Sequence, residues 1–328
     1  GIAVIAQLER YAGKRLQYYG MAIMLAIAYA ANVGGIGTKI GTAPNSQFAG
    51  FMSGIGIEIP FLAFMAVGFP FVIIFIPIVW YSLWRIGRRD VMETAAGAEA
   101  IHKEKNLLGR IKKEEWIVLA VFLVTAVLWI LGKVLTDFFK QFDLGFKLTS
   151  AHIEGSIAVL AALTLLLWRS RGKMILSGKS LTTVPWETLL LLGGSFALAA
   201  GIQQSGLSGW MGGQLAGVQN FEPFVQVLMA SLATVGISAV ASNTATIGIM
   251  LNVLHYAVTP AYMTTTLFSA TISASCDFAL PAGTPPNAIV FGSGYVTIPQ
   301  MAKTGVFLDI LAAIISSVLC WFIVRLVL

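Results

Sequence analysis

Charged residues are scarce in this sequence, and that scarcity identifies the solvent. Asp, Glu, Lys and Arg make up 11% of the 328 residues, whereas hydrophobic residues make up 57% and the mean hydropathy is +0.82. A soluble domain carries roughly 25% charged residues. The composition therefore excludes an ordinary soluble domain and indicates an integral membrane protein, whose partner is the lipid bilayer.

Cysteine and histidine are also rare, with two and three residues. Cys276 and Cys320 both stand in apolar surroundings, which indicates small hydrophobic residues and neither a disulfide framework nor a metal site. Buried titratable residues are too few for the acid–base or nucleophile constellation of an enzyme. The formal charge of +6 could suggest a nucleic-acid partner, but the basic residues are spread over separate loops. We expect neither an enzyme nor a nucleic-acid-binding protein.

Long apolar runs are what the sequence has in abundance. A membrane-spanning helix needs about 20 apolar residues, and a β-barrel would show short alternating segments instead. The chain is therefore predicted to be an all-α polytopic membrane protein. Uninterrupted apolar runs lie at roughly 59–84, 116–136, 151–168, 186–204 and 304–328. Runs interrupted by small polar residues lie at roughly 20–40, 221–257 and 262–295.

The basic residues predict how the chain is oriented. Most of them lie in the segments 10–15, 85–113 and 169–179 and at Lys303, and positively charged loops stay in the cytoplasm. An even number of spans must then separate these clusters, so one interrupted run does not cross. We expect 221–257 to form a re-entrant hairpin from outside, because it is too long for one helix. The loops 85–115 and 169–185 are then cytoplasmic and the C-terminus lies outside.

Two short motifs indicate an internal repeat. "GTAPN" at 41–45 and "GTPPN" at 283–287 match at four of five positions, and the predicted orientation makes the two copies run in opposite directions. Inverted repeats with broken helices are typical of secondary transporters. We expect 1–84 to be the remainder of the first repeat, 85–115 a cytoplasmic basic loop and 116–328 the second repeat. The counterpart of the hairpin tip 242–244 would fall just before residue 1, which predicts an N-terminally incomplete sequence.

Four segments together resemble one known family. "IAYAANVGGIGTKIGTAPN", "PWETLLLLGGSFALAAGI", "SNTATIG" and "CDFALPAGTPPNAIVFGSG" occur in the order found in the divalent anion/sodium symporters, and the resemblance covers essentially the whole chain. It implies a secondary active transporter of di- or tricarboxylates such as succinate, malate, fumarate or citrate, with sodium as the coupling ion. It also implies a homodimer in the inner or plasma membrane and elevator-type movement of one part against a scaffold.

The chemistry of the interruptions can be argued beside the resemblance. Irregular backbone at membrane depth is tolerated only where it is buried in protein or lines a cavity. A hairpin tip presents the N-terminus of its second arm, whose free N–H groups attract an anion. Ser242, Asn243 and Thr244 add hydroxyl and amide groups. A break near Gly283 frees carbonyl oxygens that can bind a sodium ion.

The site residues follow from these motifs and from the resemblance. The substrate contacts implied by the resemblance are Asn243, Thr244, Thr284 and Pro285, with Thr42 from the first repeat, and the hydroxyl of Ser242 at the tip is added to them. The cation contacts implied by the resemblance are Ser238, Asn243 and Gly283, with Gly41 in the first repeat. No metal other than sodium is expected. No Arg lies in these segments, which suits a carrier that must release its substrate.

Two charged residues depart from the usual family pattern. Lys39 stands two residues before Gly41, and Asp277 stands six residues before Gly283. Because an intramembrane ionisable group is a functional hypothesis by default, we expect Lys39 to replace a sodium ion, with Asp277 as a possible counter-charge. Glu154 and Asp309, by contrast, are expected near the ends of spans, within reach of water.

Other functions remain open at this point. A sodium-independent anion exchanger or a sulfate transporter would have the same fold, and the chain as given could be an inactive fragment. A channel would need a continuous polar pore or rings of charge, and closed hairpin tips argue against one. The residues do not distinguish one small anion from another.

Overall fold

A computed structural model describes residues 1–90, 111–142, 148–170, 173–184 and 186–328. Parts of the predicted loops 85–115 and 169–185 lie outside the described residues. The described chain is helical apart from one antiparallel pair of short strands, β1 (Arg169–Ser170) and β2 (Lys173–Met174). The predicted all-α fold class is confirmed.

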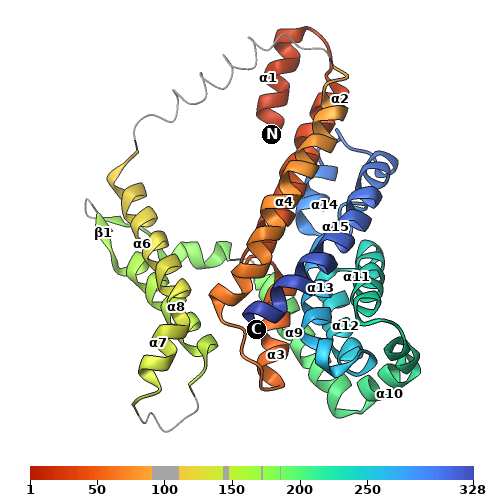
Figure 1. Ribbon diagram of the computed structural model, residues 1–328. Coiled ribbons are helices and arrows are strands. Elements are labelled where there is room, and N and C mark those ends of the chain that lie inside the picture. The colour runs from red at the N-terminus through yellow and green to blue at the C-terminus, as the bar shows by residue number, and fades with distance from the viewer. Residues whose placement is uncertain (91–110, 143–147, 171–172, 185) are drawn as a thin grey trace.

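The helices keep the chain order of the predicted apolar runs (Figure 1). The first eight are α1 (Ile2–Ala12), α2 (Gln17–Ile36), α3 (Ala43–Gly54), α4 (Phe61–Gly87), α6 (Lys113–Ile130), α7 (Gly132–Phe139), α8 (Ser150–Leu167) and α9 (Trp186–Gln204). They are followed by α10 (Leu207–Gln214), α11 (Pro223–Val240), α12 (Asn243–Ala257), α13 (Met263–Ser275), α14 (Pro285–Phe291) and α15 (Ile298–Val327). Short 3-10 turns lie at Gly178–Thr183, Ala216–Asn220 and Pro260–Tyr262.

Five described helices are long and apolar enough to cross a membrane, namely α2, α4, α8, α11 and α15. The predicted run 116–136 is divided between α6 and α7, which bend by 64° at Leu131 and would together add a sixth span. Helix α9 has the bounds expected for the run 186–204, but it is not among these candidates. Its polar ends lower its mean hydropathy, so its role as a span stays a prediction.

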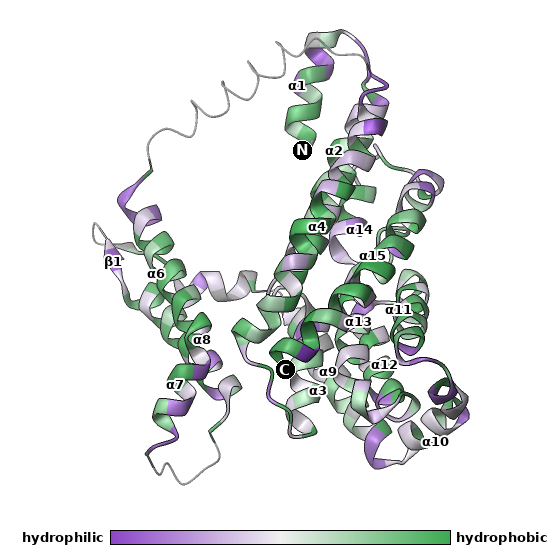
Figure 2. Ribbon diagram, in the orientation of Figure 1, coloured by the Kyte–Doolittle hydropathy of each residue, from purple (hydrophilic) through white to green (hydrophobic). Residues whose placement is uncertain are grey.

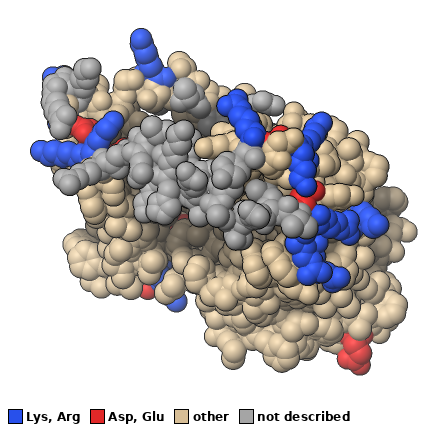
Figure 3. Space-filling view, turned by 90° about the horizontal axis from the view of Figure 1, so that it is seen from above, with Lys and Arg blue, Asp and Glu red and all other residues tan. Residues whose placement is uncertain are grey.

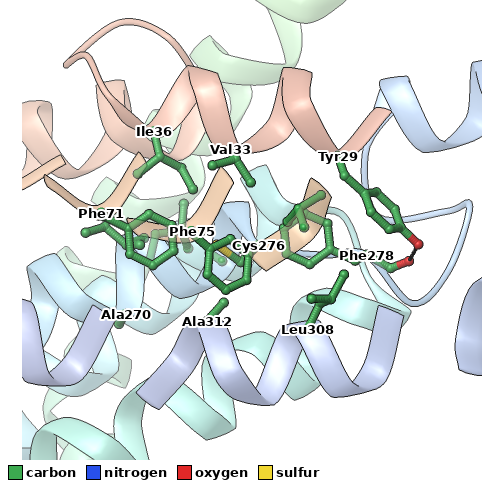
Figure 4. Packing of buried hydrophobic residues seen from close by; sticks show 14 of the residues in the cluster. Tyr29, Val33, Ile36, Phe71, Phe75, Ala270, Cys276, Phe278, Leu308 and Ala312 are labelled. Carbon is green, nitrogen blue, oxygen red and sulfur yellow. Dashed lines mark hydrogen bonds between the residues drawn. The ribbon is translucent and has the colours of Figure 1, made fainter. Parts of the chain in front are cut away.

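The core lies where α2, α4, α13 and α15 pack together. Tyr29 and Val33 of α2 meet Phe71 and Phe75 of α4 there, and Phe278 follows α13; all five side chains are fully buried (Figure 4). The rings of Phe71 and Phe75 stack with centroids 5.1 Å apart. Because lipid is as apolar as these side chains, the aromatic residues stabilise such a core mainly through close packing and not through the hydrophobic effect.

The opposite side of α4 shows that the helix is apolar all round. Phe69, Ile73 and Trp80 are 50%, 59% and 63% exposed, and most of the length of α4 has the colour of hydrophobic residues (Figure 2). A helix of this kind is typical of a membrane span, whose outer face contacts lipid. Helices α6, α7 and α8 form a separate layer beside α4 (Figure 1), joined to it by the ring contact of Phe61 with Trp129 at 5.4 Å.

The predicted hairpin is present as two helices joined by a short turn. Helix α11 ends at Val240 and α12 begins at Asn243, so the turn at Ala241 and Ser242 lies within two residues of the expected tip. With 18 residues, α11 is about 27 Å long, which is nearly the thickness of the hydrocarbon core. Its length alone would let it cross, and its re-entrant course therefore stays a prediction.

Two further interruptions divide helices near the middle of the molecule. Helix α2 ends at Ile36 and α3 begins at Ala43; α13 ends at Ser275 and α14 begins at Pro285. The second break is longer than the expected 283–286, because the helix already stops after Ser275. Helix α3 lies toward the lower end of the molecule and α14 toward the upper end (Figure 1).

Candidate functional site

An asparagine side chain ties the first break together. Asn45 Nδ2 donates to the carbonyl oxygens of Gly35 at 3.1 Å and of Thr38 at 2.8 Å. The hydroxyl of Thr42 accepts from Asn45 N at 3.4 Å and caps the N-terminus of α3. The motif therefore satisfies carbonyls that the end of α2 leaves without helical partners.

The second break has the same hydrogen bonds. Asn287 Nδ2 donates to the carbonyl oxygens of Asp277 at 2.8 Å and of Leu280 at 3.0 Å, and Thr284 Oγ1 accepts from Asn287 N at 3.4 Å. Each of these residues stands 242 positions after its counterpart in the first break, as do the two motifs. The matching bonds explain why both motifs end in Asn.

The two breaks also contact each other's preceding helices. Thr42 Oγ1 lies 3.1 Å from Ser275 Oγ at the end of α13. In the reverse direction, Thr284 Oγ1 donates to Asn32 Oδ1 of α2 at 3.3 Å, and Asn32 Nδ2 donates to Asn287 Oδ1 at 3.3 Å. Segments more than 230 residues apart in sequence thus share one buried polar region.

The hairpin turn joins this region through Ser238 and Asn243. Ser238 Oγ donates to Asn243 Oδ1 at 2.7 Å and to Ala274 O at 3.0 Å, and Asn243 N donates to Gly283 O at 3.4 Å. Ser238 is fully buried and Asn243 is 7% exposed. The structure therefore brings together the three residues predicted to bind a cation in the second repeat.

Other predicted site residues lie near this group without a bond to it. Thr244 is buried, Ser242 is half-buried and makes no side-chain cap bond, and Pro285 is exposed. Gly41 packs so closely against Gly35 O that a side chain would clash, but none of its described bonds reaches the hairpin turn.

The expected pairing of Lys39 with Asp277 is not what the structure describes. Lys39 Nζ lies 2.8 Å from Glu154 Oε2 of α8, and the two side chains are 9% and 11% exposed. The carbonyl of Glu154 accepts from Trp129 Nε1 at 3.0 Å. Lys39 therefore points toward the layer of α6 and α8, because that layer supplies the opposite charge. Whether it replaces a sodium ion stays a prediction.

Glu154 and Asp309 are also less accessible than expected. Glu154 is 9% exposed and Asp309 is 5% exposed. Burial is possible for Glu154 because Lys39 neutralises it, and for Asp309 because its Oδ1 accepts from Phe278 N at 2.8 Å. Both were expected near water from their positions close to the ends of apolar runs.

Sequence reasoning missed three residues that complete the polar region. Besides Asn32 and Ser275, Tyr29 donates its hydroxyl to Phe278 O at 2.8 Å (Figure 4). Asn32 and Tyr29 supply partners for the second break, and Ser275 supplies one for Thr42 of the first. The sequence does contain a signal for Asn32. A side-chain amide in an apolar helix costs free energy unless it forms a hydrogen bond, so Asn32 could have been expected to have a partner.

Two membrane helices broken in mid-course, each break held by an asparagine, and a polar hairpin turn set against the second break define a multi-pass membrane protein of the broken-helix class. The chain matches the family described as "Sodium:sulfate symporter transmembrane region" over residues 3–328. It belongs to this family of symporters, and the resemblance drawn from its motifs is confirmed.

Two curated relatives are sodium-dependent dicarboxylate transporters named SdcS. The protein from Staphylococcus saprophyticus is 35% identical over 314 residues, which cover 93% of this chain and 59% of the relative. The protein from Staphylococcus aureus strain USA300 is 33% identical over 324 residues, covering 95% of this chain and 60% of the relative. The chain thus spans about three fifths of the length of these relatives.

Proposed function

We propose that this chain transports dicarboxylate anions together with sodium ions. The observation that carries the proposal is the convergence of the hairpin turn on the second break, where Asn243 N lies 3.4 Å from Gly283 O. The similarity to transporters named for sodium and dicarboxylates supports it. Oxygen ligands for a cation and amide donors for an anion then lie in one region.

The anion side is built from the starts of α12 and α3. Each helix N-terminus leaves N–H groups without helical partners and carries the positive end of the helix dipole. Asn243 N, the first amide of α12, donates to Gly283 O, but Ser242 makes no side-chain cap bond, so we assign the next amides of this helix to a substrate carboxylate. We assign the hydroxyls of Ser242, Thr244, Thr42 and Thr284 to the substrate. Asn243 and Pro285 complete that set.

The cation side fits sodium. Ser238 Oγ, Asn243 Oδ1 and the carbonyl of Gly283 are the uncharged oxygen donors that a hard cation prefers, and they lie together at the turn. Nearby, both carboxylate oxygens of Asp277 are buried without a hydrogen-bond partner. When bound, a sodium ion supplies positive charge beside the anion. Gly41 is assigned to the corresponding site of the first break.

We further propose that the two breaks belong to inverted repeats, with 1–84 in the first and 116–328 in the second. Two observations support this: the matching bonds of Asn45 and Asn287, and the opposite courses of α2 to α3 and of α13 to α14 (Figure 1).

We further propose that the protein lies in the plasma membrane. The face seen in Figure 3 is then the cytoplasmic face. Lys and Arg side chains gather on this face. Arg10 in the last turn of α1, Lys14 and Arg15 after it, and Arg88 and Arg89 after α4 are all exposed. Positive charge stays inside, so the C-terminus at the opposite end lies outside. Elevator movement in a homodimer is the mechanism that we propose for this architecture.

Uptake into proteoliposomes tests the function. Radiolabelled succinate should accumulate in proteoliposomes that contain the full-length protein when an inward sodium gradient is applied. An inward potassium gradient should not support this uptake. Sulfate at equal concentration should compete weakly. Absence of succinate uptake and of succinate-dependent thermal stabilisation would refute dicarboxylate transport, and preferential uptake of sulfate would assign the chain to the anion in the family's description.

Sodium-independent exchange is the second candidate, because Lys39 already places a cation near the first break. Uptake in sodium-free medium that persists in the wild type and is lost in Lys39→Ala would favour the exchanger. Strict dependence of the wild type on sodium would exclude it.

A further inference from the structure

Asp277 is a buried carboxylate with no hydrogen-bond partner among the residues that the structure describes. Its side chain is fully buried, and neither Oδ1 nor Oδ2 makes a hydrogen bond of good geometry with the described residues, although the amides of Ala279 and Leu280 approach it. Lys39, the residue expected from the sequence to neutralise Asp277, forms an ion pair with Glu154 instead. A carboxylate in such surroundings is stable only when a positive charge or a proton compensates it.

The position of this carboxylate links it to the hairpin turn. Oδ2 of Asp277 occupies the space beside Gly283 where a Cβ atom would lie. The carbonyl of Gly283 in turn faces Asn243 N at 3.4 Å, and Asn243 Oδ1 faces Ser238 Oγ at 2.7 Å. The carboxylate is therefore adjacent to the uncharged oxygens assigned to sodium.

A second carboxylate makes this region more negative. Asp309 of α15 is close enough to Asp277 for the two charges to repel, and its Oδ1 is occupied by Phe278 N. Within the described part of the chain, no Lys or Arg forms an ion pair with either of them. Two uncompensated acidic groups of low solvent access attract a cation strongly.

We infer that Asp277 is an anionic ligand of the sodium site at the second break, an inference that rests on the proposed transport function. A charged ligand raises cation affinity above that of a site built from uncharged oxygens alone. The corresponding position of the first break is Gly35, which has no side chain to contribute. The second site should therefore bind sodium before any dicarboxylate is present.

Thermal unfolding without dicarboxylate tests this inference in the purified full-length protein. Sodium chloride is exchanged for choline chloride at constant ionic strength, and Tm is followed as sodium rises. The wild type should be stabilised with a saturating dependence on sodium. In Asp277→Asn, the sodium concentration at half-maximal stabilisation should rise about tenfold or more, as expected when a metal's coordination is impaired.

Asp309→Asn is the matched control, since it removes the neighbouring charge but keeps an oxygen that can accept from Phe278 N. Its half-maximal sodium concentration should change less than that of Asp277→Asn. If Asp277→Asn fails to fold, Asp277→Gly, which copies Gly35 of the first break, replaces it, and binding of radioactive sodium to the detergent-solubilised protein provides a second readout.

Equal sodium dependence of the wild type and the Asp277 variant would overturn the inference. A greater effect of Asp309→Asn would overturn it as well. Failure of the proposed function appears elsewhere, as absent uptake of succinate and absent stabilisation by succinate in the wild type, so the two failures can be told apart.

Discussion

The two breaks have the same backbone bonds but opposite charges. Asn45 and Asn287 each tie two upstream carbonyls at matching positions. Beside the first break, however, Lys39 forms an ion pair with Glu154, whereas beside the second the Asp277 carboxylate has no hydrogen-bond partner in the described part of the chain. The two breaks therefore share the hydrogen bonds of the motif, and residues outside the motif give them different charges.

The surroundings of the two charges differ in the same way. Lys39 and Glu154 line a cavity of about 410 Å³ between α3, α4 and the layer of α6 and α8, together with Glu58 and Ser150. Asp277 is enclosed by α2 and α15 in the core. The first break is thus tied by an ion pair to a neighbouring layer, while the acidic side chain of the second lies inside the core.

Breaking the ion pair of the first break should have the largest effect. Lys39→Ala or Glu154→Ala leaves one buried charge alone, at a cost of about 3–5 kcal/mol of unfolding free energy. The double variant Lys39→Met/Glu154→Leu should recover most of that loss. Denaturant unfolding in detergent of the wild type, the two single variants and the double variant measures this double-mutant cycle.

The exposed pair of Lys140 and Asp137 is the control for this cycle. Lys140 Nζ lies 3.9 Å from Asp137 Oδ1, and the side chains of Lys140 and Asp137 are 46% and 62% exposed. Lys140→Ala should therefore cost less than about 1 kcal/mol. If Lys39→Ala cost no more than Lys140→Ala, the buried pair would not distinguish the first break from the second.

Removing the asparagines should reveal how similar the two breaks are. Asn45→Ala and Asn287→Ala each remove two bonds to carbonyl oxygens. Thr38 O keeps its bond from Gly41 N and Asp277 O its bond from Asn32 Nδ2, so each variant should cost about 1–3 kcal/mol. Asn287→Ala should cost about 1 kcal/mol more, because Asn287 Oδ1 also accepts from Asn32, whereas Asn45 Oδ1 has no partner. Thermal unfolding compares the two.

Asn252→Ala provides the matched control for these two variants. The amide of Asn252 donates to Gly248 O within α12, and that carbonyl can keep a backbone bond in the helix, so the loss should be small. Equal losses at positions 45, 287 and 252 would show that the asparagines do not hold the breaks.

Alanine substitutions of Gly41 and Gly283 should distinguish the two breaks, because a second substitution can restore the stability of only one of the two variants. In Gly41→Ala the new methyl group meets the backbone carbonyl of Gly35, whereas in Gly283→Ala it meets the carboxylate of Asp277. Each should cost about 1–3 kcal/mol through overpacking. Adding Asp277→Gly should restore Gly283→Ala but cannot help Gly41→Ala, because the obstacle there is backbone.

Gly34→Ala controls for helix propensity in this series, since no atom lies within 4 Å of its added methyl group. It should leave Tm unchanged or raise it slightly. A Gly283→Ala protein that stays destabilised after Asp277→Gly would contradict the placement of the carboxylate.

Local motifs predicted much of the fold, and long-range contacts account for what they missed. The turn after Val240 and both breaks were predictable because Gly, Pro and Asn act on their own neighbours. The partner of Lys39 lies 115 residues away in α8, and symmetry between the repeats says which positions correspond without saying where a side chain points. The early end of α13 at Ser275 was missed, because the motif at 283–287 does not itself indicate that the interruption begins eight residues before it.

The threonine caps should give the smallest difference between the breaks. Thr42→Val and Thr284→Val each remove a cap bond that is 3.4 Å long, so each cap should contribute about 0.5–1 kcal/mol. Thr284→Val should have the greater effect, because Thr284 is 6% exposed and its hydroxyl also donates to Asn32, whereas Thr42 is only half-buried beside Ser275. Thr→Ser at either position keeps the hydroxyl and should restore Tm. If Thr284→Ser were as unstable as Thr284→Val, the lost methyl contact would explain the effect, and the two caps would no longer differ in their hydrogen bonds.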